Sequence, residues 1–187
     1  MTKNEEYLSK LADTLGVYFF YADLLKKYPQ FPFWSGSHDP KFHHFGEGGL
    51  IQHTREVVEL GLHSIAMLDN CKYVDQSEYF LAALFHDTGK MYDYEEGTWA
   101  STPHKRLIHH IPRSALIWHD ICGKNEIYEV YHDRVLHAIL AHHGTREAGS
   151  PVAPKSRVAW LLHLSDAMSA RMNDCDTLDV VNRPKYP

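Results

Sequence analysis

Seven residues of the kinds that ligate metal ions are spread along this chain at intervals of about one helix. His86 and Asp87 are adjacent and follow an apolar run, in a stretch that reads LAALFHDTGK and ends at Lys90. A neutral imidazole and a carboxylate side by side can share one divalent cation, and the second carboxylate oxygen can reach another. An isolated pair of this kind is more often a helix cap, so a metal site needs further ligands. The other candidates are His53, His110, His142, His143 and Asp166.

The elements that must position these residues are helices. Apolar residues recur at helical spacing, and the segments between them carry glycine and proline. The predicted helices cover residues 5–27, with a possible kink at Gly16, then 50–70, 75–86, 112–122, 126–141 and 156–175. No segment shows the alternation of a strand. The sequence therefore predicts an all-α domain of about six helices, with the candidate ligands converging from helix ends and inner faces on one interior site.

Residues 28–48 break every periodicity and are rich in proline, glycine and aromatic residues, which predicts a long ordered loop. His43 and His44 lie in this loop and are candidates for substrate contact or for protonating a leaving oxygen, with a purely structural role equally open. The loop aromatics would stack a base. We expect one domain over residues 1–187, with a C-terminal tail at 177–187. The remaining histidines, His38 among them, are expected to be ordinary surface or core residues.

Charge limits the class of ligand. The formal net charge is −5 and the pI is about 6.3, so no global basic field attracts long nucleic acid. A local rim of positive side chains, with Arg146 a candidate for substrate binding, fits a short or small phosphorylated substrate. The rim comprises Lys105, Arg106, Arg113, Arg146, Lys155 and Arg157.

Three cysteines without metal-like spacing indicate reduced thiols, as in a cytoplasmic protein. No apolar stretch approaches the length of a membrane span, and the first residues lack the apolar core of a signal peptide. We therefore expect a cytoplasmic protein with no membrane contact. The sequence indicates no obligate protein partner and leaves a homo-oligomer open.

Five phrases in order carry a resemblance to a known family: FHHFGEGGLIQHT, LAALFHDTGK, LIHHI, HHGTREAGSP and LLHLSDA. They resemble the HD phosphohydrolase superfamily in its two-metal form, from about His43 to Met172. The wording is most similar to the HD domain of bacterial 3'-5' exoribonucleases of the YhaM type. Two departures stand out: the N-terminal OB-fold of those enzymes is expected to be missing, and Ser169 stands near their second aspartate. The lack of Gly-Tyr-Pro weakens any resemblance to the HD-GYP group.

The resemblance implies an all-helical HD bundle and a phosphohydrolase with two divalent metal ions, which could be Mn²⁺, Fe²⁺, Zn²⁺, Ni²⁺ or Mg²⁺. It implies that Asp87 bridges the ions and that Lys90 brings positive charge to the phosphoryl oxygens, while His109, next to the ligand His110, packs or faces solvent. One ion would be held by His53, His86, Asp87 and Asp166, and the other by Asp87, His110, His142 and His143.

Three functional classes follow. The first is a phosphodiesterase that cleaves dinucleotides or short oligonucleotides with water activated by two metals. The second is a nucleotide phosphohydrolase that releases phosphate, pyrophosphate or triphosphate from mononucleotides, of the triphosphohydrolase or 5'-nucleotidase type. The third is a non-catalytic nucleotide-binding module. The intact set of candidate ligands argues against the third class, because a decayed site would lose ligands first.

Overall fold

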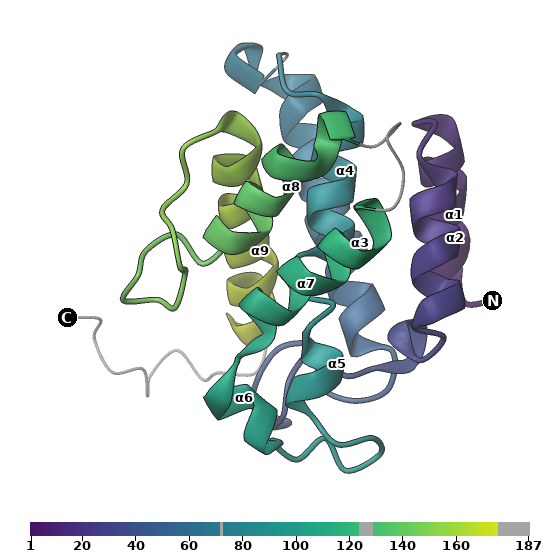
Figure 1. Cartoon of the computed structure of the whole chain (residues 1–187), viewed down its shortest axis with the longest axis vertical. Coiled ribbons are helices and arrows are strands. Elements are labelled where there is room, and N and C mark those ends of the chain that lie inside the picture. Colours follow the sequence, from purple (N-terminus) through teal and green to yellow (C-terminus); the bar gives the residue numbers. More distant parts are fainter. Residues whose placement is uncertain (72, 124–128, 176–187) are drawn as a thin grey trace.

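The computed structural model describes residues 1–71, 73–123 and 129–175, and these form the predicted all-α fold (Figure 1). The described residues contain no β-strand, and their only β-type pairings are isolated bridges between Ser37 and Phe45 and between Tyr94 and Ser101. The helices are α1 Lys3–Thr14, α2 Tyr18–Lys27, α3 Gly49–Met67, α4 Gln76–Phe85, α5 Lys90–Asp93, α6 Pro103–Leu107, α7 His110–Cys122, α8 Glu129–Ala141 and α9 Arg157–Cys175. Two 3-10 turns, η1 Phe31–Phe33 and η2 Asp69–Cys71, lie in the connections.

The helices outnumber the six predicted, for two local reasons. The segment 5–27 is two helices, because Gly16 adopts a φ of +71° that interrupts the hydrogen-bond ladder between α1 and α2. The connector after Lys90 has no long period but contains the short helices α5 and α6. Of the predicted helix 126–141, the structure describes Glu129–Ala141, and the predicted tail 177–187 lies outside the described residues.

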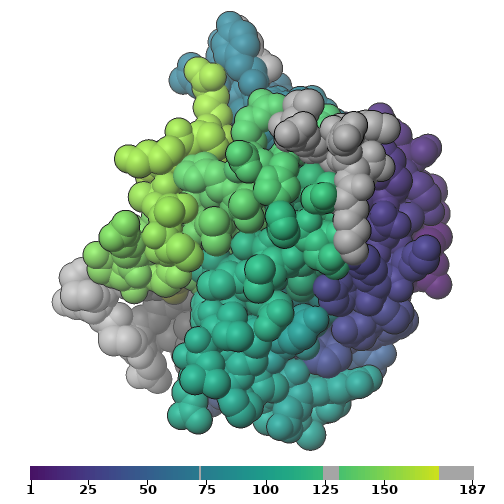
Figure 2. All heavy atoms as spheres, in the orientation of Figure 1, coloured from purple at the N-terminus to yellow at the C-terminus, as the bar shows by residue number. Residues whose placement is uncertain are grey.

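Helix α4 is the centre of the bundle. Every side chain from Glu78 to Phe85 is buried, as expected for a helix that is apolar on all sides. It packs against α3, α7, α8 and α9, and α3 also packs along α9. Helices α1 and α2 lie on one flank and α9 on the other, with α5 and α6 at one end (Figure 1). In the space-filling view, α7 and the connector before it cross the front of the molecule (Figure 2). No helix in the described residues has the length and apolar character needed to cross a membrane.

The loop 28–48 is fastened to the bundle by its backbone and by one tryptophan. The amide of Gly36 donates to the carbonyl of His44 at 2.9 Å, and the amide of Leu50 donates to the carbonyl of Trp34 at 2.9 Å. The Trp34 indole donates to the carbonyl of Lys90 at 3.1 Å. Trp34 and Phe31 are core residues and cannot stack a base as predicted, whereas Phe42 is 48% exposed. The loop thus ties the start of α3 to the turn that follows α4.

Candidate metal centre

The structure brings all seven predicted ligands to one place inside the bundle. His53 lies on α3, the pair His86 and Asp87 directly follows α4, and His110 is the first residue of α7. The pair His142 and His143 directly follows α8, and Asp166 lies on α9. They form two groups in which the potential ligand atoms lie within 4.8 Å of one another. The first group is His53, His86, Asp87 and Asp166, and the second is His110, His142 and His143.

In the first group, the Nε2 atoms of two imidazole rings face each other. His86 Nδ1 lies 2.8 Å from the carbonyl of Ala83, which can only accept, so Nδ1 carries the hydrogen of the neutral ring. His86 Nε2 is then a lone-pair nitrogen, 3.2 Å from His53 Nε2. His53 Nδ1 lies 3.1 Å from the Ser169 hydroxyl, which itself donates to Glu56 at 2.8 Å. His53 Nδ1 is therefore also the protonated nitrogen, and both Nε2 atoms present lone pairs.

Two carboxylates surround these lone pairs. Asp166 Oδ1 lies 3.0 Å from His53 Nε2, and Asp87 Oδ2 lies 3.4 Å from both His53 Nε2 and His86 Nε2. Burial alone would lower the pKa of His86, but Asp87 and Asp166 raise it to about 10. Without a metal, a proton must therefore lie among these acceptors. A divalent cation satisfies the same four atoms, so the group fits a metal ion.

The second group contains three histidines and no carboxylate of its own. Burial lowers the pKa of His110 to about 3 and that of His143 to about 4. His142 Nδ1 donates to the carbonyl of Ile139 at 2.6 Å and His143 Nδ1 to that of Ala148 at 2.9 Å, which leaves both Nε2 atoms as lone-pair donors. The Nε2 atoms of His110 and His142 are buried and have no hydrogen-bond partner. A buried polar nitrogen without a hydrogen-bond partner lowers the stability of the fold, and a bound cation would supply the missing interaction.

Asp87 touches both groups, one with each carboxylate oxygen. Oδ2 faces His53 and His86, while Oδ1 lies 3.4 Å from His110 Nε2 and 3.6 Å from His142 Nε2. Oδ1 is buried without a hydrogen-bond partner. Burial alone would raise the pKa of Asp87, but Lys90 and His86 hold it well below its usual value. The geometry is that of a carboxylate able to bridge two cations.

Gly89 lets α7 approach the Asp87 turn. The φ of Gly89 is −63°, which is open to any residue. Space is the constraint: a Cβ at Gly89 would overlap the backbone carbonyl oxygen of His110. The Gly89 amide also donates to the Ser114 hydroxyl of α7 at 2.8 Å. This contact sets His110 beside Asp87.

Lys90 is buried and pairs with the central carboxylate. Its ammonium lies 2.6 Å from Asp87 Oδ2, and its backbone carbonyl holds Trp34. Burial alone would lower the pKa of Lys90, but Asp87 raises it above its usual value, so the ammonium stays charged. Lys90 lines the same cavity of about 300 Å³ as Asp87, His110, His143 and Asp166.

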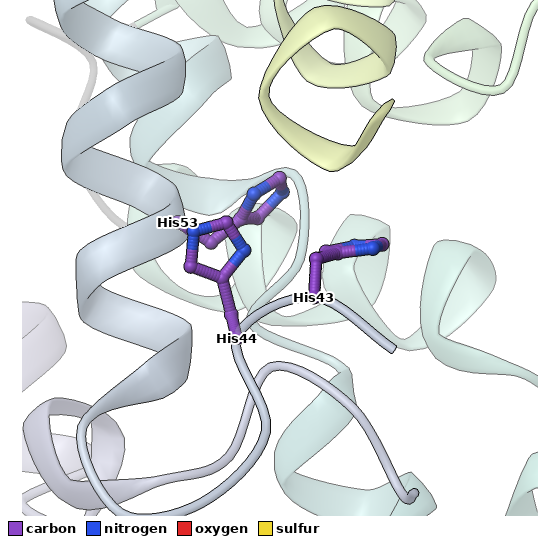
Figure 3. Close-up of side chains that lie close together, drawn as sticks. All are labelled: His43, His44 and His53. Atoms are coloured by element: carbon purple, nitrogen blue, oxygen red, sulfur yellow. The ribbon is translucent and has the colours of Figure 1, made fainter. Parts of the chain in front are cut away.

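The two loop histidines occupy different positions (Figure 3). His44 lies beside His53, has a side chain only 1% exposed and bonds Glu56 through Nε2 at 2.9 Å. It supports the loop and is not among the residues that line the cavity, whereas His43 is. Nitrogens of His43, His44 and His53 lie within 4.8 Å of one another. His53 Nδ1 faces Ser169 and His53 Nε2 faces the first ligand group, so these three rings do not make a separate metal site.

Two supporting carboxylates went unrecognised in the sequence. Asp93 is fully buried, with Oδ1 2.8 Å from His104 Nδ1 and Oδ2 3.4 Å from His110 Nδ1. Glu56 accepts from Ser169 and thus orients His53 through that hydroxyl. Burial alone would raise the pKa of Glu56, but His44 and Ser169 lower it to about 2. Such partners fix which ring nitrogen faces a metal.

Ser169→Ala is expected to weaken the first metal site by about tenfold, because His53 loses the partner that fixes its tautomer. A chelator competition on the purified protein measures this. Ser169→Thr keeps a hydroxyl and serves as the matched control, which should stay close to the wild-type affinity. An alanine variant that holds its metal as tightly as the wild type would exclude this role for Ser169.

Other predicted binding residues lie elsewhere. Arg146 is exposed and lines a different cavity, together with His137 and Lys155. Arg113 stacks on Tyr92, and Arg157 lies over Tyr73. Of the predicted rim, Lys105 lines the cavity of the metal ligands. His109, expected to pack or face solvent, also lines it, with its ring centroid 4.1 Å from that of His110. A larger cavity of about 870 Å³ between α3, α4 and α9 contains none of the predicted ligands.

The chain matches a known protein family. The HD domain model matches residues 50–171, so the chain belongs to the HD domain family. A 3'-5' exoribonuclease YhaM from Geobacillus sp. (strain WCH70) is 30% identical over 157 residues, which are 82% of this chain and 46% of the relative. A dihydroneopterin 2',3'-cyclic phosphate phosphodiesterase from Methanocaldococcus jannaschii is 31% identical over 139 residues, 71% of this chain and 51% of the relative.

The chain thus spans about half the length of the curated relatives that it matches. No solved structure matches it significantly. The family and the names of its relatives identify an HD-domain hydrolase of the metal-dependent kind, as the motifs predict. The His and Asp groups are able to hold metal ions.

Proposed function

We propose that this protein is a two-metal phosphodiesterase that cleaves dinucleotides or short single strands to 5'-nucleoside monophosphates. The observation that carries the proposal is the position of Asp87, with one carboxylate oxygen against each histidine group. Divalent cations held in this way lower the pKa of a water molecule and neutralise phosphate oxygens on both sides of the scissile bond. The names of the relatives, an exoribonuclease and a cyclic phosphate phosphodiesterase, support phosphodiester chemistry.

We assign each residue a role from its position in the site. The first ion would be held by His53, His86, Asp87 and Asp166, and the second by Asp87, His110, His142 and His143. Lys90 lines the cavity with its ammonium beside Asp87, where it can bind a non-bridging phosphate oxygen. His43 enters the same cavity from the loop and can contact the leaving sugar. The mixed imidazole and carboxylate donors suit Mn²⁺, Fe²⁺, Zn²⁺ or Ni²⁺ better than Mg²⁺, which prefers oxygen ligands.

The cavity limits the size of the substrate. About 300 Å³ is at the small end for ligand sites and accommodates about one nucleotide beside the metal ligands. A net charge of −5 gives no extended field for a long strand. A short strand or a dinucleotide therefore fits better than duplex nucleic acid.

Product analysis tests the proposal. The metal-loaded protein is incubated with dinucleotides, cyclic dinucleotides, nucleoside monophosphates and nucleoside triphosphates, and the products are separated by chromatography. Dinucleotides are expected to yield 5'-nucleoside monophosphates, and long duplex should react at least about tenfold more slowly. Intact dinucleotides with release of phosphate or triphosphate from mononucleotides would instead establish a nucleotide phosphohydrolase, which the small cavity also fits.

A further inference from the structure

The wall of the cavity beside the metal ligands is built from three separate segments. His38 and Phe42 come from the loop 28–48, Tyr94 follows α5, and Lys105 lies in α6. Neither the histidine nor the aromatic rings of this wall can be explained by metal binding, because none of them belongs to either ligand group. The wall therefore faces whatever part of the substrate lies beyond the reacting phosphate.

Lys105 is held in place without a carboxylate. Its ammonium donates to His38 Nδ1 at 2.9 Å and lies 5.0 Å from the centroid of the Tyr94 ring. The described residues place no carboxylate within ion-pair distance of it, in contrast to Lys90 with its 2.6 Å contact to Asp87. Burial lowers the pKa of Lys105, Asp93 opposes this shift from beyond ion-pair distance, and the charge of Lys90 adds to it. A partly buried cation that has no carboxylate in direct contact is stabilised by an anionic ligand.

His38 is oriented by the same contact. Because Lys105 can only donate, His38 Nδ1 accepts, and Nε2 carries the hydrogen of the neutral ring. The ring is stacked on Tyr94, with centroids 6.0 Å apart and planes 27° apart, and lies 5.4 Å from the Phe42 ring. The Nε2–H group of His38 and the ammonium of Lys105 are thus two hydrogen-bond donors that lie next to each other in the cavity wall. Convergent donors of this kind recognise the oxygens of a phosphate.

We propose that Lys105 and His38 form a second anion subsite, which binds a phosphate of the substrate that is not cleaved. This inference rests on the proposed function, since it assigns the reacting phosphate to the metal centre. It defines the preferred substrate class as short nucleotides with a second phosphate next to the scissile one. A neutral base would leave the Lys105 ammonium without a direct ion pair and would be a poorer ligand at this point.

Binding of a nucleotide with two phosphates tests the subsite directly. Isothermal titration calorimetry on the metal-loaded protein compares adenosine 3',5'-bisphosphate with adenosine 5'-monophosphate. The wild type should bind the bisphosphate at least about tenfold more tightly, as expected for charge-assisted hydrogen bonds. In Lys105→Met this preference should fall by about tenfold. Lys41→Met removes an exposed lysine from the loop 28–48, which carries His38. Lys41 does not line the cavity, so this variant should keep the wild-type preference.

The outcomes separate this inference from the proposed function. Equal affinity of the wild type for both ligands, or an unchanged preference in Lys105→Met, overturns the second subsite. Hydrolysis of bis(p-nitrophenyl) phosphate by the wild type, a diester with no second phosphate, reports on the phosphodiesterase alone. If that diester stays intact while the bisphosphate preference depends on Lys105, the subsite stands and the proposed function fails.

Discussion

Asp87→Ala is expected to lower kcat/KM for a simple phosphodiester by at least about a thousandfold, which corresponds to about 4 kcal/mol of transition-state stabilisation. Asp87 is the residue whose two oxygens contact both histidine groups, so its loss removes a ligand from each ion at once. It also leaves the buried ammonium of Lys90 without its carboxylate. Initial rates with bis(p-nitrophenyl) phosphate measure the effect.

A matched control separates catalysis from folding. Asp133→Ala removes an aspartate that is 94% exposed on α8 and should retain the wild-type rate. Circular dichroism must show that the Asp87 variant keeps its helical content. A folded Asp87 variant with more than a tenth of the wild-type rate would contradict the bridging role.

His110→Ala is expected to lower the rate by at least about a hundredfold, and His109→Ala by much less. His110 Nε2 is buried, has no hydrogen-bond partner and faces Asp87 Oδ1, whereas His109 is only half-buried at the cavity wall. His109 adopts φ 73° and ψ 156°, a region that favours glycine, and alanine keeps the same strain there. The pair is therefore matched in position and in backbone cost.

Rates of both variants with the same diester decide between the neighbours. The expected order is wild type, then His109→Ala, then His110→Ala. The reverse order, with His109→Ala inactive beside an active His110→Ala, would assign the ligand to His109 and to its alternative group with Asp93.

Four of the candidate ligands could be singled out from the sequence because each has a local signature. Two pairs of polar residues directly follow the ends of helices that carry many apolar residues: His86 with Asp87, and His142 with His143. Adjacent ligand-type residues at such positions suggest a functional role. The helix ends also supply the hydrogen-bond partners of two of these histidines. His86 and His142 each donate to the backbone carbonyl three residues earlier, and the end of a helix offers this carbonyl to any histidine at that position. Local pattern was therefore sufficient to mark these four residues as candidates.

The supporting residues lack such a signature. Ser169 meets His53 across 116 positions of the chain, and a serine on a helix face is usually unremarkable. Asp93 lies in a connector without periodicity, and only the packing of α5 against α7 brings it to His110. Lys105 was one of six similar cations in the sequence, and tertiary packing alone distinguishes it from Arg146, which lines another cavity. Contacts between distant segments decide these roles.

The number of metal ions bound per chain tests the central claim most directly. The purified protein is saturated with Mn²⁺, freed of loosely bound metal by gel filtration and analysed by inductively coupled plasma mass spectrometry. The two ligand groups joined by Asp87 predict about two ions per wild-type chain and fewer than one in Asp87→Ala. A wild-type protein that binds one ion or none at saturation, or an Asp87 variant that retains two, would contradict the bridged two-metal centre.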